Sequence, residues 1–212
     1  MSAVPVSQIA QAVRASAPRL PRTRVVLVDG PAGSGKTTVA NHLAVELGGA
    51  PSAGAGTFDP ATDRADDAAV QILHADDMYE GWGGLDALDE VLLDQILEPL
   101  AAGRDAGFHM WDWHRSERTH RIPVPPRAVL IVEGVGVASP RARAHAVLTV
   151  WVEAPADVRL RRGIERDGEA MREEWERWQS VEARVLDAHD TRSAADVVVD
   201  GTGVLPDASG AL

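Results

Sequence analysis

One stretch, residues 25–44, constrains the fold of this chain more than any other. It begins with five residues, Val25 to Asp29, that are apolar and β-branched enough to form a buried strand. Residues 30–37 then read Gly-Pro-Ala-Gly-Ser-Gly-Lys-Thr, which fits the pattern G-x-x-x-x-G-K-[ST], and good helix formers follow. Strand, glycine loop and helix in this order predict a phosphate-binding loop, or P-loop.

The residue types of this loop suit the binding of a nucleoside triphosphate. Glycines let successive backbone N–H groups turn inward around phosphate oxygens, and the following helix directs its positive end toward them. Lys36 is expected to reach the β- and γ-phosphates, and the Thr37 hydroxyl to ligate Mg²⁺. The residues expected to bind the nucleotide are Gly30, Ala32, Gly33, Ser34, Gly35, Lys36, Thr37 and Thr38.

Lys36 is the single lysine of the chain, whose other basic residues, apart from the histidines, are all arginine. A compact ammonium has been kept at the one place where a planar guanidinium would not fill a point-charge role inside a tight loop. The alternative is a glycine-rich strand-to-helix turn without a ligand. The flanking strand and helix, together with this lysine, favour the P-loop.

Composition indicates one globular domain over residues 1–212, since 45% of the residues are hydrophobic and 25% are charged. The net charge of −11 argues against a nucleic-acid partner bound through a broad basic face. Cysteine is absent, which excludes disulfides, thiolate metal sites and a cysteine nucleophile. Without a signal-peptide pattern or a run of about 18 apolar residues, we expect a cytoplasmic protein with no membrane partner. A homo-oligomer is left open.

Apolar strands alternate with helices along the chain, which predicts an α/β P-loop NTPase fold: a parallel sheet of about five strands with helices on both faces. After the first strand, further strands are predicted at Val70–Leu73, Ala128–Val132, Val147–Val152 and Asp196–Asp200. Helices are predicted at residues 5–16, after the P-loop, at 85–100, where Pro99 and Gly103 end the helix, and at 155–190, which form a lid and the helix after it.

Other segments separate these elements. Residues 22–49 are expected to hold the strand, P-loop and helix, and residues 50–69 to form a flexible surface loop. The prolines between residues 123 and 126 predict a rigid connector, and Gly201 onward a frayed tail. The acidic residues of the loop are expected to be solvated rather than metal-binding: Asp63, Asp66 and Asp67.

Two carboxylates, Asp76 and Asp77, come just after the strand Val70–Leu73. In parallel α/β sheets ligands gather beyond the carboxyl ends of strands, so this pair is expected to face the P-loop. A carboxylate there suits a group that accepts a proton from an attacking hydroxyl. The alternative is that one or both residues cap the next element.

Glu133 closes the fully apolar strand Ala128–Val132. An acidic residue at such a strand tip in a P-loop protein is the usual place for a group that helps to hold Mg²⁺. An unpaired carboxylate there would be costly, so the alternative is a salt-bridge partner. Thr37 and Glu133 are therefore the predicted metal site.

Residues 110–121 are predicted to form an aromatic and polar wall of a pocket. Two tryptophans flank an aspartate, and a histidine and two arginines follow: Trp111, Asp112, Trp113, His114, Arg115 and Arg118. The alternative is a pair of core tryptophans with surface arginines.

Three arginines, Arg159, Arg162 and Arg166, fall at steps of three and four on one predicted helix, so they share a face. Like charges at this spacing repel unless an anion lies between them, and a triphosphate is such an anion. The alternative is that Glu165 and Glu169 neutralise them on a solvated face.

In order and spacing, these blocks resemble the uridine kinase and phosphoribulokinase group of P-loop kinases, which also includes a bacterial pantothenate kinase, over about residues 25–200. After the P-loop, Asp76-Asp77-Met78-Tyr79 looks like the family's Asp-x-Phe-Tyr, which implies that Asp76 is the base. Residues 111–115 resemble its Tyr-Asp-Phe…His-x-Arg segment, whose aromatic residue and histidine contact the nucleoside. Glu133-Gly134 matches its Glu-Gly after a strand.

The segment 157–167 is close to the family's lid sequence, which implies that Arg162 and Arg166 approach the phosphates. The resemblance implies an ATP- and Mg²⁺-dependent kinase that transfers the γ-phosphoryl group to a hydroxyl of a small acceptor, with a nucleoside favoured. The catalytic residues are then Lys36, Asp76, Arg162 and Arg166. The acceptor is expected to contact Asp77, Tyr79, Trp111, Asp112, His114 and Arg115.

Two departures from the family pattern concern the acceptor site. The acidic segment that holds the ribose in uridine kinases is shortened to residues 81–86, and His114 follows Trp113 directly. The run DGPAGSGKTT also looks like bacterial cytidylate kinases, whose following Asp-x-Gly-x-x-Tyr-Arg pattern is missing here. The alternatives are thus a nucleoside monophosphate or other small-metabolite kinase, or a regulatory ATPase without an acceptor. The single asparagine, Asn41, excludes the Asn-Lys-x-Asp motif of a GTPase.

Overall fold

A computed structural model of the protein describes residues 4–61 and 68–203. The acidic residues Asp63, Asp66 and Asp67, expected to be solvated, lie outside this range. The strands of the described chain are β1 (Arg24–Asp29), β2 (Val70–His74), β3 (Ala106–Asp112), β4 (Glu117–Val124), β5 (Val129–Glu133), β6 (Ala146–Glu153) and β7 (Val197–Asp200). The α-helices are α1 (Val6–Ala15), α2 (Lys36–Glu46), α3 (Glu98–Ala101), α4 (Pro140–Arg143), α5 (Ala156–Asp167), α6 (Arg172–Ala188) and α7 (Thr191–Ala194). Tighter or wider helical turns form η1 (Ala75–Asp77), η2 (Gly81–Ala87), η3 (Glu90–Leu97) and η4 (Glu169–Met171).

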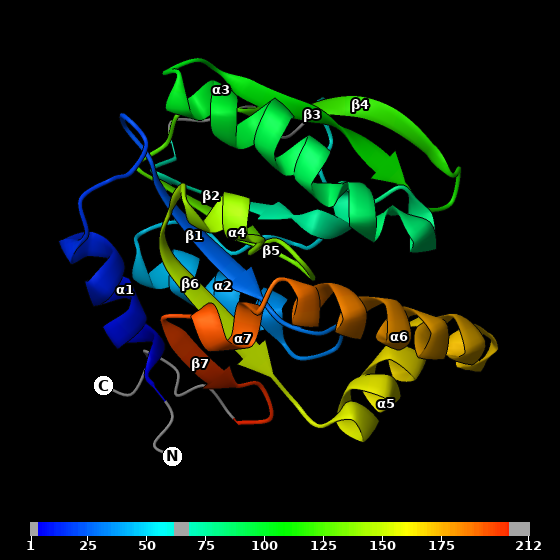
Figure 1. The fold of residues 1–212 in the computed structure, drawn as a ribbon. Helices are drawn as coiled ribbons and strands as arrows, with labels where there is room; N and C mark the ends of the chain where they lie inside the picture. Colours follow the sequence, from blue (N-terminus) through cyan, green and yellow to red (C-terminus); the bar gives the residue numbers. More distant parts are fainter. Residues whose placement is uncertain (1–3, 62–67, 204–212) are drawn as a thin grey trace.

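A parallel sheet of five strands forms the centre of the molecule, in the order β2-β5-β1-β6-β7 (Figure 1). This confirms the predicted sheet. The register aligns three strand tips, because Glu133 of β5 lies opposite both His74 of β2 and Val28 of β1. Residues that follow these strands therefore emerge at one end of the sheet.

Side chains that alternate along β1 give the sheet two apolar faces. Val25 and Leu27 belong to one core, and Val26 and Val28 to the other. Helices α1 and α2 cover the second core, while η2, η3 and α6 cover the first (Figure 1). Helices on both faces of a parallel sheet confirm the predicted α/β class.

Strands β3 and β4 form an antiparallel hairpin that the sequence did not reveal. Residues 110–121 were interpreted as the wall of a pocket, and the prolines from 123 to 126 as a connector. The connector prediction is wrong at Pro123, which lies within β4 and opposite Gly107. A proline is tolerated there because the described hairpin has only two strands, so one edge of β4 needs no partner.

The predicted helix over residues 85–100 is present but built differently. It starts with the tight turns of η2, continues through the wide π turns of η3 and finishes as α3. The prediction that Pro99 ends the helix is wrong, since α3 continues to Ala101. A proline ring crowds the carbonyl four residues before it, and the wide turns just ahead of Pro99 give room for this. The helix ends where Gly103 takes a φ of +70°.

Gly201 does not begin a free tail. Its N–H donates to the Glu153 carbonyl at 2.8 Å, and its carbonyl accepts from Arg162 at 3.0 Å. A Cβ atom on Gly201 would lie 1.7 Å from the carbonyl oxygen of Ser34. The chain after β7 is thus pressed against the P-loop, and only a glycine permits this approach.

Asp29, at the end of β1, ties the strand to the chain that follows β5. Its carboxylate is fully buried and accepts the backbone N–H groups of Gly30, Gly136 and Ala138 at 2.6 to 2.8 Å. Burial raises the pKa of this carboxyl, and the three hydrogen bonds oppose that rise. A buried carboxylate with three N–H donors fixes where the P-loop leaves the sheet.

The described part of the predicted flexible loop is attached to the domain. The Asn41 side chain forms two hydrogen bonds with the backbone of Ser52, at 2.9 and 3.1 Å. The Gly56 N–H donates to the Asp77 carboxylate at 2.6 Å. Phe58 packs against the core and lies 5.7 Å from the ring of His120. Residues 50–61 therefore form a fixed cover beside the end of β2.

Within the part of the chain that the structure describes, no helix combines the length and the apolar character needed to cross a membrane.

The burial of Asp77 predicts a pH-dependent stability. Burial raises the pKa of Asp77 from 3.8 to about 6, although the Gly56 N–H lowers it. The folded chain therefore binds more protons than the unfolded chain between these two values, and this group's contribution to stability falls as the pH rises through that window. Asp77→Asn keeps an acceptor for Gly56 but cannot ionise. We expect it to be more stable than wild type at pH 7.5, by up to about 3 kcal/mol, and equally stable near pH 4.

Urea denaturation at both pH values measures this difference in the free energy of unfolding. The exposed Asp105, replaced by asparagine, is the matched control and should follow the wild-type pH profile. Equal stability of wild type and Asp77→Asn at pH 7.5 would contradict the interpretation.

Candidate active site

The P-loop has the backbone conformation that its glycines predict. Gly30, Gly33 and Gly35 have φ angles of +144°, +75° and +100°. Two of these glycines also have no room for a side chain. A Cβ on Gly30 would lie 2.0 Å from the Val152 carbonyl oxygen, and one on Gly33 would lie 2.7 Å from that of Arg159. The loop is therefore packed tightly between β6 and the first turns of α5.

Several polar groups of the loop have no partner in the described chain. The N–H groups of Gly33, Gly35 and Lys36 donate to no described protein group. The Ser34 hydroxyl is buried and has no hydrogen-bond partner among the described residues. Unsatisfied donors at a helix N-terminus are the groups that bind phosphate oxygens, so the loop fits an anionic ligand.

Lys36 supplies a positive charge in the same place. Its side chain is mostly buried, and its ammonium donates to the Pro31 carbonyl at 3.1 Å. The charge is close enough to lower the pKa of four carboxyls: Asp29, Asp76, Glu133 and Glu182. The predicted base and the predicted metal-binding carboxylate thus both lie near Lys36.

Glu133 lies between β2 and the P-loop helix. Its Oε1 atom accepts the Thr37 hydroxyl at 3.0 Å and lies 2.6 Å from Nδ1 of His74. The sequence left a metal-binding role and a salt bridge as alternatives. The structure shows the salt-bridge partner, His74, while the metal-binding role stays a prediction. Thr37 and Glu133, the predicted metal-binding pair, are therefore adjacent.

Burial disfavours charge on both Glu133 and His74. Their mutual hydrogen bond and the neighbouring charges together outweigh burial, so the pKa of Glu133 is lowered and the pKa of His74 is raised. His74 also contacts the Ser52 hydroxyl through Nε2 at 2.7 Å. Sequence reasoning missed His74 as the residue that orients Glu133; the only signal was its position at the end of a predicted strand.

The two aspartates after β2 differ in their surroundings. Asp77 is buried and occupied by the Gly56 N–H. Asp76 is solvent-exposed, yet enough protein surrounds it that loss of hydration raises the pKa of its carboxyl, with a further rise from Glu133. The charges of Lys36 and Arg166 oppose this rise. Neither aspartate caps η1 through its side chain, so the capping alternative is not supported.

The three predicted phosphate-facing arginines of α5 have different partners in the structure. Arg159 pairs with Glu182 at 2.7 Å. Arg162 donates to the carbonyls of Gly33 and Gly201, both at 3.0 Å. The Arg162 guanidinium is thus bonded to the backbone of the loop and of the chain after β7, and its predicted approach to the phosphates is not tested by the structure.

Arg166 is the arginine whose charge reaches the candidate site. It pairs with Asp167 at 2.8 Å, lies over the ring of Trp175, and influences the pKa of Asp76. The proposed neutralisation by Glu165 and Glu169 is wrong, since these residues pair with Arg161 and Arg172 instead.

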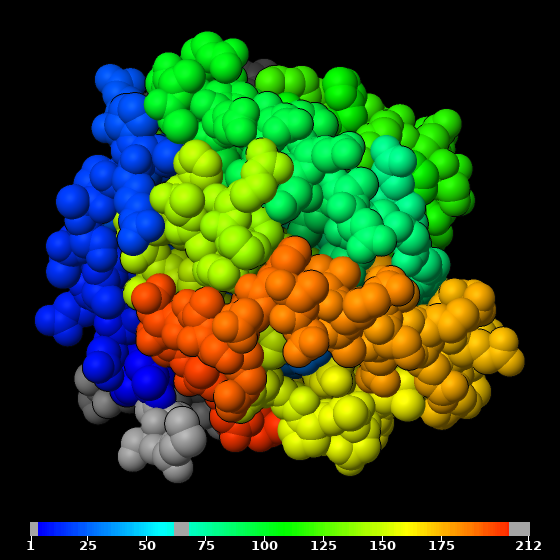
Figure 2. Space-filling model, in the orientation of Figure 1, coloured from blue at the N-terminus to red at the C-terminus, as the bar shows by residue number. Residues whose placement is uncertain are grey.

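Helices α5 and α6 are locked together rather than free. A Cβ on Gly163 would lie 2.4 Å from the ring of Trp175, whose indole N–H donates to Asp167 at 2.9 Å. Figure 2 shows the two helices, yellow and orange, side by side on one face of the molecule. The two helices of the predicted lid are therefore packed together near the turn that joins them, where Arg166 also lies.

The residues predicted to bind the acceptor differ in their burial and in their hydrogen-bond partners. Tyr79 is buried, and its hydroxyl donates to the Val135 carbonyl at 2.5 Å, so it supports the site from the core. Asp112 accepts the N–H groups of His114 and Arg115 at 2.9 and 3.0 Å and so closes the β3–β4 turn. The Tyr79 hydroxyl and one Asp112 oxygen are thus engaged with the protein backbone, and contact of these residues with an acceptor stays a prediction. Trp111 is partly buried at the base of the turn.

His114 and Arg115 are exposed at the tip of the hairpin, and Arg115 lies 3.7 Å from Glu117. Trp113 was predicted as part of the pocket wall but not as an acceptor contact, and its indole N–H donates to the Asp76 carbonyl at 2.8 Å. Its ring packs 5.6 Å from Trp82, which in turn contacts Trp175 and Trp178. This aromatic cluster joins Asp76, the hairpin and α6.

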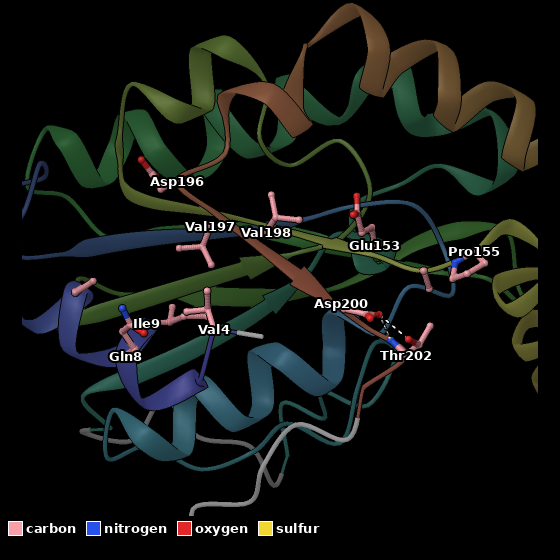
Figure 3. A pocket seen from close by; sticks show the side chains of 12 residues that line it. Val4, Gln8, Ile9, Glu153, Pro155, Asp196, Val197, Val198, Asp200 and Thr202 are labelled. Carbon is pink, nitrogen blue, oxygen red and sulfur yellow. Dashed lines mark hydrogen bonds between the residues drawn. The ribbon is translucent and has the colours of Figure 1, made fainter. Parts of the chain in front are cut away.

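A separate groove of about 900 Å³ lies between α1 and the edge strand β7 (Figure 3). Ile9 and Val197 line its apolar part, and Pro155 and Thr202 its end near the P-loop. It is at the opposite edge of the sheet from β2, and it shares no residue with the predicted site.

Comparisons with solved structures support the fold. A protein provisionally described as a uridine kinase, from Bacillus stearothermophilus, is 21% identical, with a TM-score of 0.60 over 92% of this chain and 97% of that one. A protein provisionally described as a fructose transport system kinase, from Silicibacter sp. TM1040, is 18% identical, with a TM-score of 0.62 over 92% and 98%. At such identities the likeness shows the fold alone.

No curated protein matches the chain by sequence. The model of the Phosphoribulokinase / Uridine kinase family matches residues 25–191, which run from β1 to the first residue of α7. This span includes the P-loop, both strand-tip carboxylates, the hairpin and the docked α5 and α6. The chain therefore belongs to the phosphoribulokinase/uridine kinase family of P-loop kinases.

Proposed function

We propose that this protein is an ATP- and Mg²⁺-dependent kinase that transfers the γ-phosphoryl group to a hydroxyl of a small acceptor, with a nucleoside as the favoured class. The observation that carries the proposal is the proximity of Lys36, Glu133 and Asp76 at one end of the sheet. A phosphate anchor, an oxygen ligand for a metal and a carboxylate base are the groups that phosphoryl transfer needs.

The donor side is assigned to the P-loop. The N–H groups of Gly33 and Gly35, with the Lys36 ammonium, are available to bind phosphate oxygens. Phosphoryl transfer requires little covalent chemistry from the protein, so binding the phosphates in fixed positions supplies much of the catalysis.

Thr37 and Glu133 fit Mg²⁺, which prefers oxygen ligands and is usually held by one or two protein groups together with phosphates and water. Among the described residues no group of three or more His, Asp or Glu side chains could hold a metal by itself. This agrees with an ion that arrives with the nucleotide. When bound, Mg²⁺ would neutralise charge on the phosphates.

Asp76 is assigned as the base. It is exposed, whereas Asp77 is buried and bonded to Gly56, so Asp76 alone of the pair can meet an acceptor hydroxyl. Its raised pKa makes it a better proton acceptor than an ordinary aspartate. The Trp113 indole fixes its backbone. His114 and Arg115 at the hairpin tip are proposed to contact the acceptor.

Arg166 is proposed to stabilise the charge that develops on the transferred group. Arg162 is assigned a different role, which is to hold the carbonyls of Gly33 and Gly201 so that the loop keeps its shape.

A screen for phosphate transfer tests the function. ATP and Mg²⁺ would be incubated with nucleosides, nucleoside monophosphates, pantothenate and sugar phosphates, and ADP release would be measured. We expect at least one acceptor to stimulate ADP release and to appear as a phosphorylated product. ATP hydrolysis that no acceptor stimulates would favour a regulatory ATPase instead.

Replacing the proposed base should separate chemistry from binding. We expect Asp76→Asn to lower kcat by about 100-fold or more, as the loss of a general base does, while the Kd for ADP stays within about threefold. Asp77→Asn is the neighbouring control, with kcat within about fivefold of wild type. The reverse order of the two effects would make Asp77 the base.

Arg166→Ala should lower kcat by about 100-fold or more, since arginines that stabilise phosphoryl transfer contribute at least this much. The free energy of unfolding should change by less than about 1 kcal/mol, because the Arg166 side chain is largely exposed. Arg161→Ala, an exposed position on the same helix, is the control and should keep wild-type turnover. Unchanged turnover in Arg166→Ala would remove it from the mechanism.

A further inference from the structure

A buried carboxylate from α6 contacts the P-loop directly. Glu182 is 1% exposed, and its Oε2 atom accepts the Ala32 N–H at 2.7 Å. Its other oxygen, Oε1, accepts from Arg159 of α5 at 2.7 Å. The first of these bonds connects a residue 150 positions away in the sequence to the third residue of the loop.

Arg159 completes the clamp from the other side of the same residue. Its Nη1 atom lies 3.3 Å from the Ala32 carbonyl oxygen, and its Nε atom donates to the Ala154 carbonyl at 3.1 Å. Ala32 is therefore held by both of its backbone polar groups. We call Glu182, Arg159 and Ala32 the loop clamp.

Burial of this ion pair does not by itself stabilise the fold. Taking two charges out of water costs about as much as their attraction returns, and apolar replacements of buried pairs are often neutral or better. Glu182 also lies close enough to Lys36 for the lysine charge to lower the pKa of its carboxyl, against the rise that burial causes. We therefore explain the Glu182–Arg159 pair by the backbone groups of Ala32 that it holds in place.

The geometry of a trans peptide shows that holding the Ala32 carbonyl also sets the direction of the Gly33 N–H. The C=O of one residue and the N–H of the next share a plane and point in opposite directions, and the described chain has no cis peptide. Because the Ala32 carbonyl points toward Arg159, the Gly33 N–H of the same peptide points away from Arg159. That N–H donates to no described protein group.

We propose that Glu182 is a positioning residue for the P-loop: acting with Arg159 on Ala32, it sets the peptide between Ala32 and Gly33 so that the Gly33 N–H is ready to bind a nucleotide phosphate. This inference rests on the proposed binding of ATP at the loop. It assigns a role in phosphate binding to a residue that touches neither nucleotide nor acceptor.

Direct binding of nucleotide tests the role. Isothermal titration calorimetry with ADP and Mg²⁺, without acceptor, would compare wild type, Glu182→Gln, Arg159→Lys and Glu174→Gln. Glu174 is the matched control because it lies on the same helix and pairs with Arg177 at the surface. We expect the Kd for ADP to rise about tenfold or more in Glu182→Gln and Arg159→Lys, and to stay within twofold in Glu174→Gln.

Steady-state kinetics distinguish positioning of the P-loop from a general contribution of Glu182 to stability. At a temperature where the variants are folded, the KM for ATP should rise with the Kd, while the KM for the acceptor stays within about twofold. The double variant should bind ADP no more weakly than the weaker single variant, since both changes release the same residue, Ala32.

The possible results separate the two proposals. Wild type that binds ADP together with a Glu182→Gln variant that binds equally well would overturn the positioning role and leave the kinase function intact. Additive losses in the double variant would also overturn it. Wild type that binds no nucleotide would overturn the proposed function and this inference with it.

Discussion

The hydrogen bond between the Thr37 hydroxyl and the Glu133 carboxylate is the contact on which the candidate site depends. It joins the first turn of α2 to the tip of β5, and Glu133 is in turn held by His74 at the tip of β2. The parallel register of β1, β5 and β2 brings these residues to one end of the sheet. A charged group at a buried strand tip is thereby satisfied by partners that also belong to the site.

A second constraint is the close packing around the P-loop. Val152 and Arg159 approach the backbone of Gly30 and Gly33 so closely that no side chain fits at either glycine, and Gly201 has no room for one beside Ser34. Arg162 and the loop clamp hold the loop's outward carbonyls, which leaves inward N–H groups without protein partners. The groups proposed to bind phosphate are thus already in place without a ligand, which is the preorganisation that catalysis by electrostatics requires.

Much of this arrangement could be predicted from the sequence because it follows from local patterns. The P-loop motif fixes its own conformation, and the tips of parallel strands converge whatever the intervening chain does. This is why Asp76 and Glu133 could be placed near Lys36. Contacts between distant segments could not be predicted. No pattern links Glu182 to Ala32, and nothing near Tyr79 indicates that its hydroxyl reaches Val135.

The errors have a common physical origin. Polar and aromatic residues in the hairpin were interpreted by their chemistry, although their backbone pairs as β3 and β4. Arg162 was assigned to phosphates from helical spacing, which says which face a residue occupies but not what lies opposite that face. Pro99 was taken as a helix end, although wide turns accommodate it. Tertiary contacts decided each case.

The measurement that tests the account most directly is a crystal structure with Mg²⁺ and a non-hydrolysable ATP analogue. The account predicts phosphates within the loop of residues 30–37, Mg²⁺ bound by the Thr37 hydroxyl, and the γ-phosphate on the side of Asp76. A nucleotide bound outside this loop, or one whose γ-phosphate points away from Asp76, would contradict it.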